Sequence, residues 1–541
     1  MRSSYFATVQ EYYDLYIELL MNEHRARPNE NFAFEALQAS EQARARSLLD
    51  LLREAKADVR QGVDTLLLAR ERELLELINA KAAAQVKAFS DPKQANLAKS
   101  LGDEISELAI EYDALQARIR QSSPRYAQLV QTAPLTLAGI QSLLDGQTLL
   151  LEYRLGAEHS YLWVVSQTEL KSFELPRRAE IESLSRQFYE LLTERNRSSP
   201  GETSAQKQSR IQAAEQELQA VAERLRQILL VPDAMSVGDR RLVVVVDGQL
   251  QYVPFGVLIG ATAGKEVNEG NSSQSRAEII SLPSIAVLAQ LRRENVGRTT
   301  ATKSVAVFAD PVFESDDPRL GRFAKRKRSP NGSLEQSLRD FDFGPNTKGL
   351  PRLFASRDEA KAIMNLAPRG ANYAALDFEA NRERALRPDL NQYRVLHFAT
   401  HGLLNTARPQ LSGVVLSLYD EKGNERDGFL RLDQIYNLRL SSELVVLSAC
   451  STALGKEVKG EGMIGLTRGF MYAGAQRVIA SLWKVDDEAT AELMKSFYRN
   501  LLQERMPASL ALRAAQVEMQ RQARWRSPYY WGAFTLQGDW R

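Results

Sequence analysis

The chain contains a single cysteine, Cys450, among its 541 residues. One thiol cannot form an internal disulfide or a multi-thiolate metal site, so disulfide scaffolds and cysteine-rich zinc domains are excluded. The sequence also lacks a Walker A loop, an H-E-x-x-H pair and a G-x-S-x-G elbow. We therefore expect neither a metal nor a cofactor, and the lone cysteine fits a reducing, cytoplasmic compartment.

Long apolar runs and an excess of one charge are also missing. No stretch of about 18 apolar residues exists to span a bilayer, and the first residues include Glu11, Asp14 and Glu18 instead of an apolar signal core. The 70 basic and 68 acidic residues give a formal net charge of +2. This balance implies no strong attraction to nucleic acid or to a membrane surface, so we expect neither as a partner.

The first 135 residues show helical periodicity. Tyr12, Leu15, Tyr16 and Leu19 form one apolar stripe, and a second stripe follows between Phe34 and Leu52. We interpret residues 1–60 as a helix pair and residues 61–135 as a helical hairpin with a coiled-coil seam. The seam consists of Leu101, Ile105, Leu108, Tyr112, Leu115 and Ile119, facing Leu67, Leu74 and Ile78.

The apolar period changes after residue 136. Residues 136–236 are predicted to form a mixed subdomain, with paired strands at 149–153 and 161–165 and a long helix. One face of that helix carries Ile211, Leu218, Val221, Leu225 and Ile228. Residues 237–541 are predicted to form an α/β domain with buried strands at 242–246 and 305–309. The chain is thus expected to be α-helical first and α/β afterwards.

Two short, apolar and β-branched runs in the α/β domain end at chemically reactive side chains. VLHFAT at 395–400 is followed by His401 and Gly402, and LVVL at 444–447 is followed by a short segment that contains Cys450. Runs of this kind favour buried parallel strands. Because ligands bind beyond the carboxyl ends of the strands in open α/β sheets, we expect His401 and Cys450 to face one cleft.

A histidine beside a cysteine indicates nucleophilic catalysis. The thiolate is the attacking species, and a nearby imidazole can accept its proton or pair with it. Cys450 follows His401 by about 50 residues, a spacing also found in caspases. His397 competes for the same role, since positions four apart on a strand share a face. We prefer His401 because it lies at the strand end, before Gly402. The alternative for the pair is that Cys450 is a small buried apolar residue and His401 is a structural histidine.

Five phrases occur in one order and together resemble the CHAT domain, a caspase-like module that is usually fused to tetratricopeptide repeats and is related to separases. They are HFATHG at 397–402, VLSACST at 446–452, GEG at 460–462, ASLWKVDD at 480–487 and PYYWGAF at 528–534. The resemblance extends from about residue 242 to residue 540. The helix pair, with ARARSLLDLL at 43–52, is similar to the tetratricopeptide unit that commonly precedes such domains.

The resemblance implies a caspase-like αβα sandwich with a mostly parallel sheet, and a peptidase with His401 as base and Cys450 as nucleophile. It also implies an oxyanion hole made by the backbone amides of Gly402 and Cys450, and a glycine suits this role because no Cβ obstructs the approach. By its similarity to separases, Asp487 would bind a P1 arginine or lysine, with Asp486 as the neighbouring alternative. Otherwise either aspartate would simply cap the following helix.

Two further patterns have alternative interpretations. GEGMIG at 460–465 satisfies the dinucleotide pattern G-x-G-x-x-G, but it does not follow a strand directly, and Glu461 would bring negative charge to a pyrophosphate. We interpret it as a glycine-rich loop. The basic run from Arg322 to Arg328 is expected to be a solvated loop. A sharper hypothesis makes this run a site of self-cleavage after a basic residue.

Two functional hypotheses follow from the sequence. The first is a cytoplasmic cysteine endopeptidase that cleaves a protein or peptide substrate after Arg or Lys and is regulated by a protein bound at the N-terminal helices. The second is a catalytically silent scaffold, in which the helices and the αβα domain only bind other proteins. An intact pair of catalytic residue types does not by itself distinguish the two, because one fold hosts both uses.

Overall fold

A computed structural model describes most of the chain: residues 2–54, 135–197, 199–231, 240–260, 277–323, 350–403, 412–448, 450–451 and 462–541, with scattered positions between 66 and 115. It divides into two compact units, one made of Met1–Arg44 with Leu135–Arg541 and the other of Ala45–Pro134. Most of the basic run that carries the self-cleavage hypothesis, and the start of the glycine-rich phrase, lie outside the described residues.

Within the unit Ala45–Pro134, contacts link residues that are far apart in sequence. Arg70 donates to Glu111 at 2.7 Å, and Lys81 pairs with Glu104. The residue number rises from 70 to 81 on one segment while it falls from 111 to 104 on the other, so the two helical segments run antiparallel. Leu74, Leu101 and Leu115 are buried in this unit.

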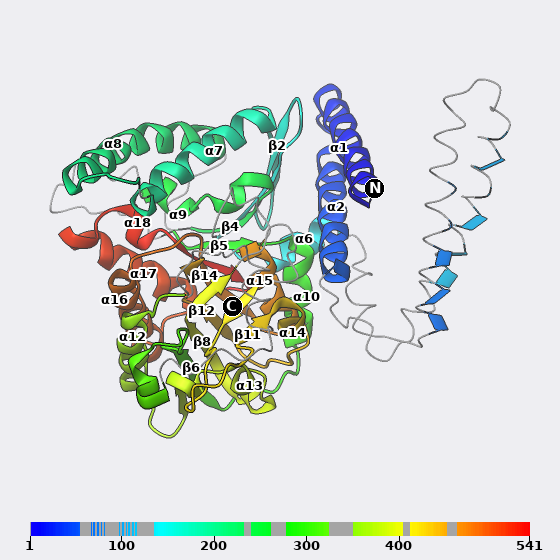
Figure 1. Cartoon of the computed structure of the whole chain (residues 1–541). Coiled ribbons are helices and arrows are strands. Elements are labelled where there is room, and N and C mark those ends of the chain that lie inside the picture. The colour runs from blue at the N-terminus through cyan, green and yellow to red at the C-terminus, as the bar shows by residue number, and fades with distance from the viewer. Residues whose placement is uncertain are drawn as a thin grey trace. The chain divides into compact units, whose positions relative to one another are not determined.

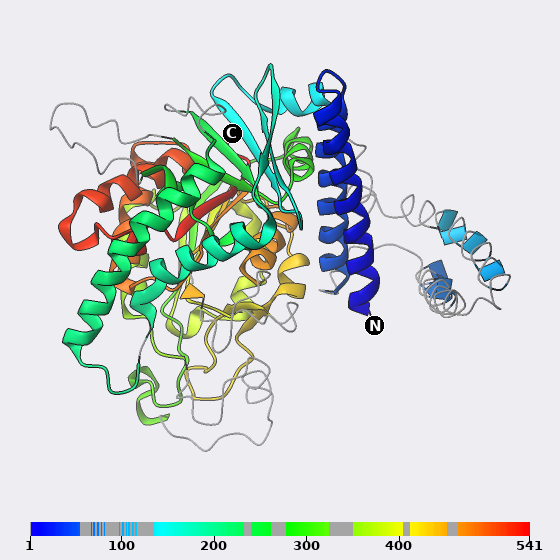
Figure 2. The same cartoon turned by 90° about the horizontal axis from the view of Figure 1, so that it is seen from above.

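The larger unit begins with α1 (Arg2–Ala26) and with α2 (Phe32–Glu54) as far as Arg44, and the two helices lie side by side (Figure 1, Figure 2). The two helices bury Ile17, Leu20, Ala36 and Leu37. The sequence stripe on α1 faces the other way, and the exposed fractions of Tyr12, Leu15, Tyr16 and Leu19 are 68%, 59%, 50% and 54%. An apolar face of α1 is therefore open to solvent.

A polar group of contacts fixes α2 to the sheet. Ser40 Oγ donates to Glu152 Oε1 at 2.7 Å, and Arg44 Nε reaches the same oxygen at 3.3 Å. Glu41 accepts the first two backbone N–H groups of α10 (Ile285–Asn295) at 3.0 and 2.9 Å, which suits the partial positive charge of a helix N-terminus. Since Glu41 and Glu152 are both buried, two carboxyl groups share one enclosed interface.

The main sheet has the spatial order β3-β2-β1-β4-β5-β15-β14-β12-β8-β6-β7. Its strands are β1 (Thr148–Arg154), β2 (Ser160–Val165), β3 (Leu170–Leu175), β4 (Arg241–Val245), β5 (Ile279–Leu282), β6 (Lys303–Ala309), β7 (Asn372–Leu376), β8 (Tyr393–Ala399), β12 (Leu444–Leu447), β14 (Arg477–Ser481) and β15 (Phe534–Gly538). The predicted strand pair at 149–153 and 161–165 is confirmed as β1 and β2, which are antiparallel. The predicted strands at 242–246 and 305–309 are confirmed as β4 and β6.

Most neighbouring strands are parallel, as the sequence predicts. β15 is parallel to β5 but antiparallel to β14. Consequently β1, β4, β5 and β15 run in one direction, while β14, β12, β8, β6 and β7 run in the other. Apart from β2 and β3, which pair antiparallel at one edge, the sheet thus consists of two parallel sets of strands joined at the β14–β15 pair.

Helices cover both faces of this sheet (Figure 1, Figure 2). On one side, α12 (Phe354–Leu366), α16 (Asp487–Tyr498) and α17 (Ala508–Arg521) pack in a row, and on the other α14 (Leu432–Tyr436) packs with α15 (Gly462–Tyr472). The prediction of an αβα sandwich with a mostly parallel sheet, preceded by helices, is confirmed.

A further helix pair, α7 (Arg178–Thr193) and α8 (Ser204–Leu229), packs beside the strands that precede β5 (Figure 1). α8 begins with a capping box between Thr203 and Gln206. The predicted apolar face of this helix is confirmed: Ile211, Leu218, Val221 and Leu225 are buried, and Ile228 is partly buried against the core. Within the part of the chain that the structure describes, no helix combines the length and the apolar character needed to cross a bilayer.

Candidate functional site

The predicted histidine and cysteine lie beyond two neighbouring strands. β8 and β12 are adjacent and parallel, so they end at the same edge of the main sheet. Beyond them a second sheet has the order β11-β10-β9-β13. Its strands are β9 (His401–Leu403), β10 (Gly413–Val415), β11 (Phe429–Arg431) and β13 (Cys450–Ser451).

In this second sheet, Cys450 is the direct parallel partner of His401, and Ser451 is the partner of Gly402. The backbones of His401 and Cys450 therefore lie side by side, because neighbouring strands are about 4.8 Å apart. The side chain of Cys450 and residues 452–461 lie outside the described residues. The structure thus brings the two backbone positions together.

His401 is enclosed, with an exposed fraction of 1%. Its Nε2 lies 2.7 Å from the carbonyl oxygen of Pro351, shortly before α12. A carbonyl oxygen can only accept a hydrogen bond, so Nε2 carries the proton and Nδ1 holds the lone pair. Nδ1 is buried and has no hydrogen-bond partner among the described residues. Phe313 packs on the ring, with 4.9 Å between the ring centroids.

Burial lowers the pKa of His401 to about 4. The Pro351 carbonyl partly opposes this shift, and the positive charge of Lys484 adds to it. The imidazole is therefore neutral at pH 7, and its bare Nδ1 is free to accept a proton. This protonation state is the one that a general base needs before the reaction begins.

His397, the competing histidine, has different surroundings. It is fully buried in β8, where Nδ1 lies 2.9 Å from the hydroxyl of Tyr498 in α16. Nε2 lies 3.0 Å from Glu359 Oε1 in α12, but out of line for a good hydrogen bond. Both ring nitrogens thus face side chains of the helical layer. This arrangement ties two helices to the sheet and suits a structural role.

Gly402 is buried in the centre of the second sheet. Its Cα partners are Val414 on β10 and Ser451 on β13. The glycine directly follows His401, shortly beyond the end of β8, where the sequence prediction puts an oxyanion hole. The participation of the Gly402 and Cys450 amides in such a hole stays a prediction.

Asp486 and Asp487 have different roles at the start of α16. Asp486 is exposed and is the N-cap, because its Oδ1 accepts the backbone N–H groups of Glu488 and Ala489, each at 3.1 Å. Asp487 is half-buried, and no hydrogen bond between described residues uses its carboxylate. Burial, and then the charge of Asp486, raise its pKa, while Lys484 opposes this shift. Of the two aspartates, Asp487 is thus the one whose carboxylate does not cap the helix.

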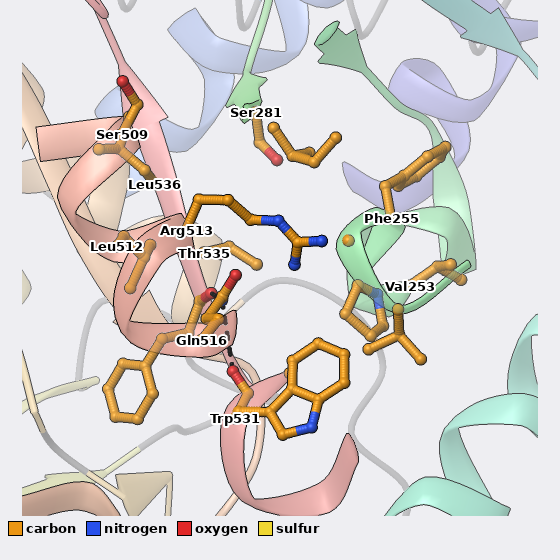
Figure 3. Close-up of a pocket in the computed structure, with 16 residues that line it drawn as sticks. Val253, Phe255, Ser281, Ser509, Leu512, Arg513, Gln516, Trp531, Thr535 and Leu536 are labelled. Atoms are coloured by element: carbon orange, nitrogen blue, oxygen red, sulfur yellow. Dashed lines mark hydrogen bonds between the residues drawn. The ribbon is translucent and has the colours of Figure 1, made fainter. Parts of the chain in front are cut away.

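A cavity of about 40 Å³ lies elsewhere in this unit, lined in part by α17 and by α18 (Pro528–Trp531). Figure 3 shows Arg513 directed into it between Phe255 and Trp531. None of the predicted site residues lines this space. It has room for a few ordered water molecules and not for a peptide. The cavity is therefore separate from the His401 site.

The sequence analysis did not identify Pro351 or Phe313. Pro351 contacts His401 through its backbone carbonyl oxygen. Every residue type has such an oxygen, so the sequence does not reveal this contact. Phe313 offered a weak signal, because it is a large apolar residue just beyond the end of β6, where loops of an α/β sheet gather around a site. Both residues lie far from His401 in sequence and are brought to it only by the fold.

The fold and the site define an α/β domain in which a buried, neutral histidine is paired by strand register with the single cysteine. Residues 219–539 match the CHAT domain family, which is more than half of the chain. The chain belongs to the CHAT domain family, and the resemblance of the five phrases is confirmed.

Among curated proteins, the chain is similar to tetratricopeptide repeat protein 28 of Mus musculus, with 27% identity over 329 residues. It is also similar to tetratricopeptide repeat protein 28 of Homo sapiens, with 26% identity over 331 residues. Each match covers 56% of this chain but 12% of the relative. The match therefore extends over a small part of these relatives' own length.

Solved structures show weaker likenesses. The separase–securin complex of Saccharomyces cerevisiae matches 81% of this chain and 33% of its own, with 11% identity and a TM-score of 0.44. The Arg-specific cysteine proteinase gingipain R matches 67% of this chain and 74% of its own, with 11% identity and a TM-score of 0.33. These scores are too low to support an inference about activity.

Proposed function

We propose that the chain is a cysteine endopeptidase in which Cys450 is the nucleophile and His401 is the general base. The observation that supports this best is the parallel register of β9 and β13, which pairs the two residues directly. The protonation of His401 supports it further, because the bare nitrogen is Nδ1 and the proton is fixed on Nε2 by Pro351. A base held in one tautomer by a third group is the usual arrangement behind an activated nucleophile.

The reaction would proceed in two halves. Nδ1 of His401 takes the thiol proton, and the thiolate of Cys450 attacks the peptide carbonyl carbon. The backbone amides of Gly402 and Cys450 stabilise the oxyanion, and the imidazolium then gives its proton to the leaving amine. Water hydrolyses the acyl-enzyme and restores the thiol. Throughout, Nε2–H stays on the carbonyl of Pro351, so the ring keeps one orientation.

The buried state of His401 implies a weakly active resting form. A cysteine thiol has a pKa of about 8.5, so proton transfer to an imidazole with a pKa of about 4 costs about 6 kcal/mol before the two new charges attract each other. The pair would therefore rest as a neutral thiol and a neutral imidazole. A substrate or a partner that reduces the burial of the ring would raise its pKa and favour the ion pair.

We propose Asp487 as the acid that selects a basic P1 residue. Its neighbour Asp486 is committed to the helix cap, whereas Asp487 is half-buried, has no ion-pair partner among the described residues, and has its pKa raised mainly by burial. A substrate arginine would supply that partner with a fork of two hydrogen bonds, and a lysine would supply it as a point charge.

Regulation would act through the N-terminal helices, with a protein partner on the open apolar face of α1. The exposed stripe of Tyr12, Leu15, Tyr16 and Leu19 is larger than the scattered single apolar residues of an ordinary surface. The same helix pair is fixed to the sheet through α2, so a bound partner would act on the unit that carries the site. A cytoplasmic location is part of this proposal.

The second candidate function is a catalytically silent scaffold. The enclosure of His401 favours it, because a histidine that is 1% exposed offers a substrate no direct access. A cysteine-reactive peptide probe separates the two candidates. Selective labelling of Cys450 that His401→Ala abolishes would favour the peptidase, whereas labelling that ignores His401 would favour the scaffold.

The deciding experiment is cleavage of fluorogenic peptides that carry Arg, Lys, Leu or Asp at P1. Activity on Arg or Lys that both Cys450→Ala and His401→Ala abolish would establish the peptidase. Asp487→Asn is expected to lower kcat/KM on arginine peptides by about tenfold to hundredfold, the loss expected for a hydrogen bond between charged groups.

Asp486→Asn is the matched control for the P1 pocket. It changes the neighbouring carboxylate, and asparagine also serves well as an N-cap, so α16 keeps its start. Equal effects of the two replacements would contradict the assignment of Asp487. If no peptide is cleaved and the cysteine-reactive probe does not label Cys450 selectively, the scaffold is favoured.

A further inference from the structure

Five charged residues gather beyond the ends of β6 and β7, and we name them the Asp310 cluster: Asp310, Asp377, Arg319, Arg352 and Arg357. Asp310 directly follows β6, and Asp377 directly follows β7. Their φ angles are 49° and 53°, which non-glycine residues adopt only where the surroundings hold them. Because β6, β7 and β8 are parallel neighbours, the cluster lies at the edge of the sheet where β9 begins.

Asp310 is fully buried at the centre of the cluster. Arg352 binds it with a fork, Nε to Oδ1 at 2.8 Å and Nη2 to Oδ2 at 2.7 Å. Arg357 Nε donates to Oδ2 at 2.6 Å, and Arg319 Nη1 donates to the Asp310 carbonyl at 2.6 Å. Forked bonds of this kind fix direction as well as distance, so the carboxylate holds Arg352 in one geometry.

The remaining contacts balance the charge of the cluster. Asp377 pairs with Arg319 at 2.8 Å and also with Arg357. Arg319 further pairs with Asp317 at 2.6 Å. With Asp317, which lies outside the five named residues, three guanidinium groups thus face three carboxylates. Arg352 shares only Asp310 among these acids, so it is the member whose replacement leaves the other ion pairs in place.

Pro351 and Phe313, which contact the imidazole of His401 among the described residues, are both chain neighbours of this cluster. Pro351, whose carbonyl fixes the proton of Nε2, is bonded directly to Arg352. Phe313, which packs on the ring, comes three residues after Asp310. The Asp310–Arg352 fork therefore links the segment that carries Pro351 to the segment that carries Phe313.

We propose that Asp310 and Arg352 are positioning residues for His401: their fork holds the carbonyl of Pro351 at Nε2 and thereby selects the ring tautomer that leaves Nδ1 bare. This inference rests on the proposed function, since the tautomer matters only if His401 is a base. The opposing explanation is that the cluster merely stabilises two loops. The two explanations differ in whether His401 itself responds when the fork is removed.

The test is ring ¹⁵N NMR of the histidines in the full chain carrying Cys450→Ala, with Arg352→Gln added. The parent should show His401 protonated on Nε2 and bare on Nδ1, with a titration midpoint near pH 4. Arg352→Gln should give a mixture of tautomers and lower the midpoint, because it weakens the Pro351 hydrogen bond that raises the pKa of His401. His397, four residues earlier and held by Tyr498, is an internal reference for the intact fold.

Arg387→Gln is the matched control, because Arg387 makes the same fork with Asp389, at 3.0 and 2.8 Å, on the exposed surface. It should leave His401 unchanged. A change in His401 alone, seen only in Arg352→Gln, would support the inference. An unchanged His401 in that variant would overturn it, and so would a joint change of His397 and His401, which indicates general loosening.

The same measurement separates this inference from the proposed function, because it needs no catalysis. A protein that cleaves no peptide but shows the expected change in His401 would favour the scaffold and retain the positioning role. In an active protein, the pH optimum of cleavage by Arg352→Gln should move in the same direction as the midpoint of His401. Arg352→Lys keeps the charge without the fork and should rescue only part of the parent behaviour.

Discussion

Replacing Glu41 with glutamine is expected to prevent the loss of stability at high pH where α2 contacts the sheet. Burial, and then the charge of Glu152, raise the pKa of Glu41 well above its ordinary value of 4.5. Burial also raises the pKa of Glu152, although the charge of Arg44 opposes the shift. Two carboxyl groups in one buried interface cannot both ionise without cost.

The sign of the effect follows from the raised pKa. Above the ordinary glutamate range, the native state keeps a proton that the unfolded chain has released. The contribution of these carboxyls to stability is therefore fully present at low pH and is lost as the pH rises through the raised values. Each unit by which the pKa of Glu41 is raised corresponds to about 1.4 kcal/mol.

Glutamine is neutral at every pH and keeps one oxygen to accept an N–H group of α10. We therefore expect Glu41→Gln to resemble the wild type near pH 5 and to be more stable near pH 8, by about 1.4 kcal/mol for each unit by which the pKa of Glu41 is raised. Hydrogen exchange of the α2 and α10 amides, corrected for its intrinsic pH dependence, measures the free energy of this local opening.

Glu35→Gln changes an exposed carboxylate on the same helix and serves as the control. Its opening free energy should follow that of the wild type across the pH range. The reasoning fails if the wild type and Glu41→Gln keep a constant difference from about pH 5 to pH 8, because the interface would then hold no extra proton.

Two further predictions concern burial in the same unit. Leu37→Ala, at a fully buried position of α2, should cost about 2–5 kcal/mol of opening free energy. Leu15→Ala on the exposed stripe should cost less than about 0.5 kcal/mol. Hydrogen exchange of α1 and α2 measures both losses, and equal losses would contradict this prediction. Tyr498→Phe leaves Nδ1 of the buried His397 without its hydroxyl partner and should cost about 1–3 kcal/mol, measured by urea unfolding, while Tyr12→Phe at the surface should have no measurable effect.

The sequence predicts the strands of this fold well because their residues are buried on both faces. The valines at 242–246 and 305–309 form continuous apolar runs, which is the pattern of a parallel strand covered by helices on each side. The same reasoning placed His401 and Cys450 beyond adjacent strand ends, where the backbone register now pairs them. The direction of each half of the sheet could not be predicted, because an apolar run is the same in either direction.

The immediate surroundings of His401 could not be predicted for a different reason. Pro351 acts through its backbone, and the Asp310 cluster joins charged residues from separate loops. In a sequence, such residues resemble ordinary solvated loop charges. Only the positive φ angles and the burial of Asp310 distinguish them, and both are properties of the folded chain. The choice between Asp486 and Asp487 likewise depended on which residue becomes the N-cap.

The position of β15 has a consequence for how the chain reaches this structure. β15 lies between β5 and β14, so a strand that comes late in the sequence joins two halves that come earlier. Until Leu536 can pair with Ile280, β5 and β14 are both unprotected edges. On a ribosome, the two halves would emerge and collapse separately, and the sheet would close only when β15 arrives. A chaperone that shields exposed strand edges during synthesis would then increase the yield of native protein, and loss of the residues that form β15 would leave two halves prone to aggregate.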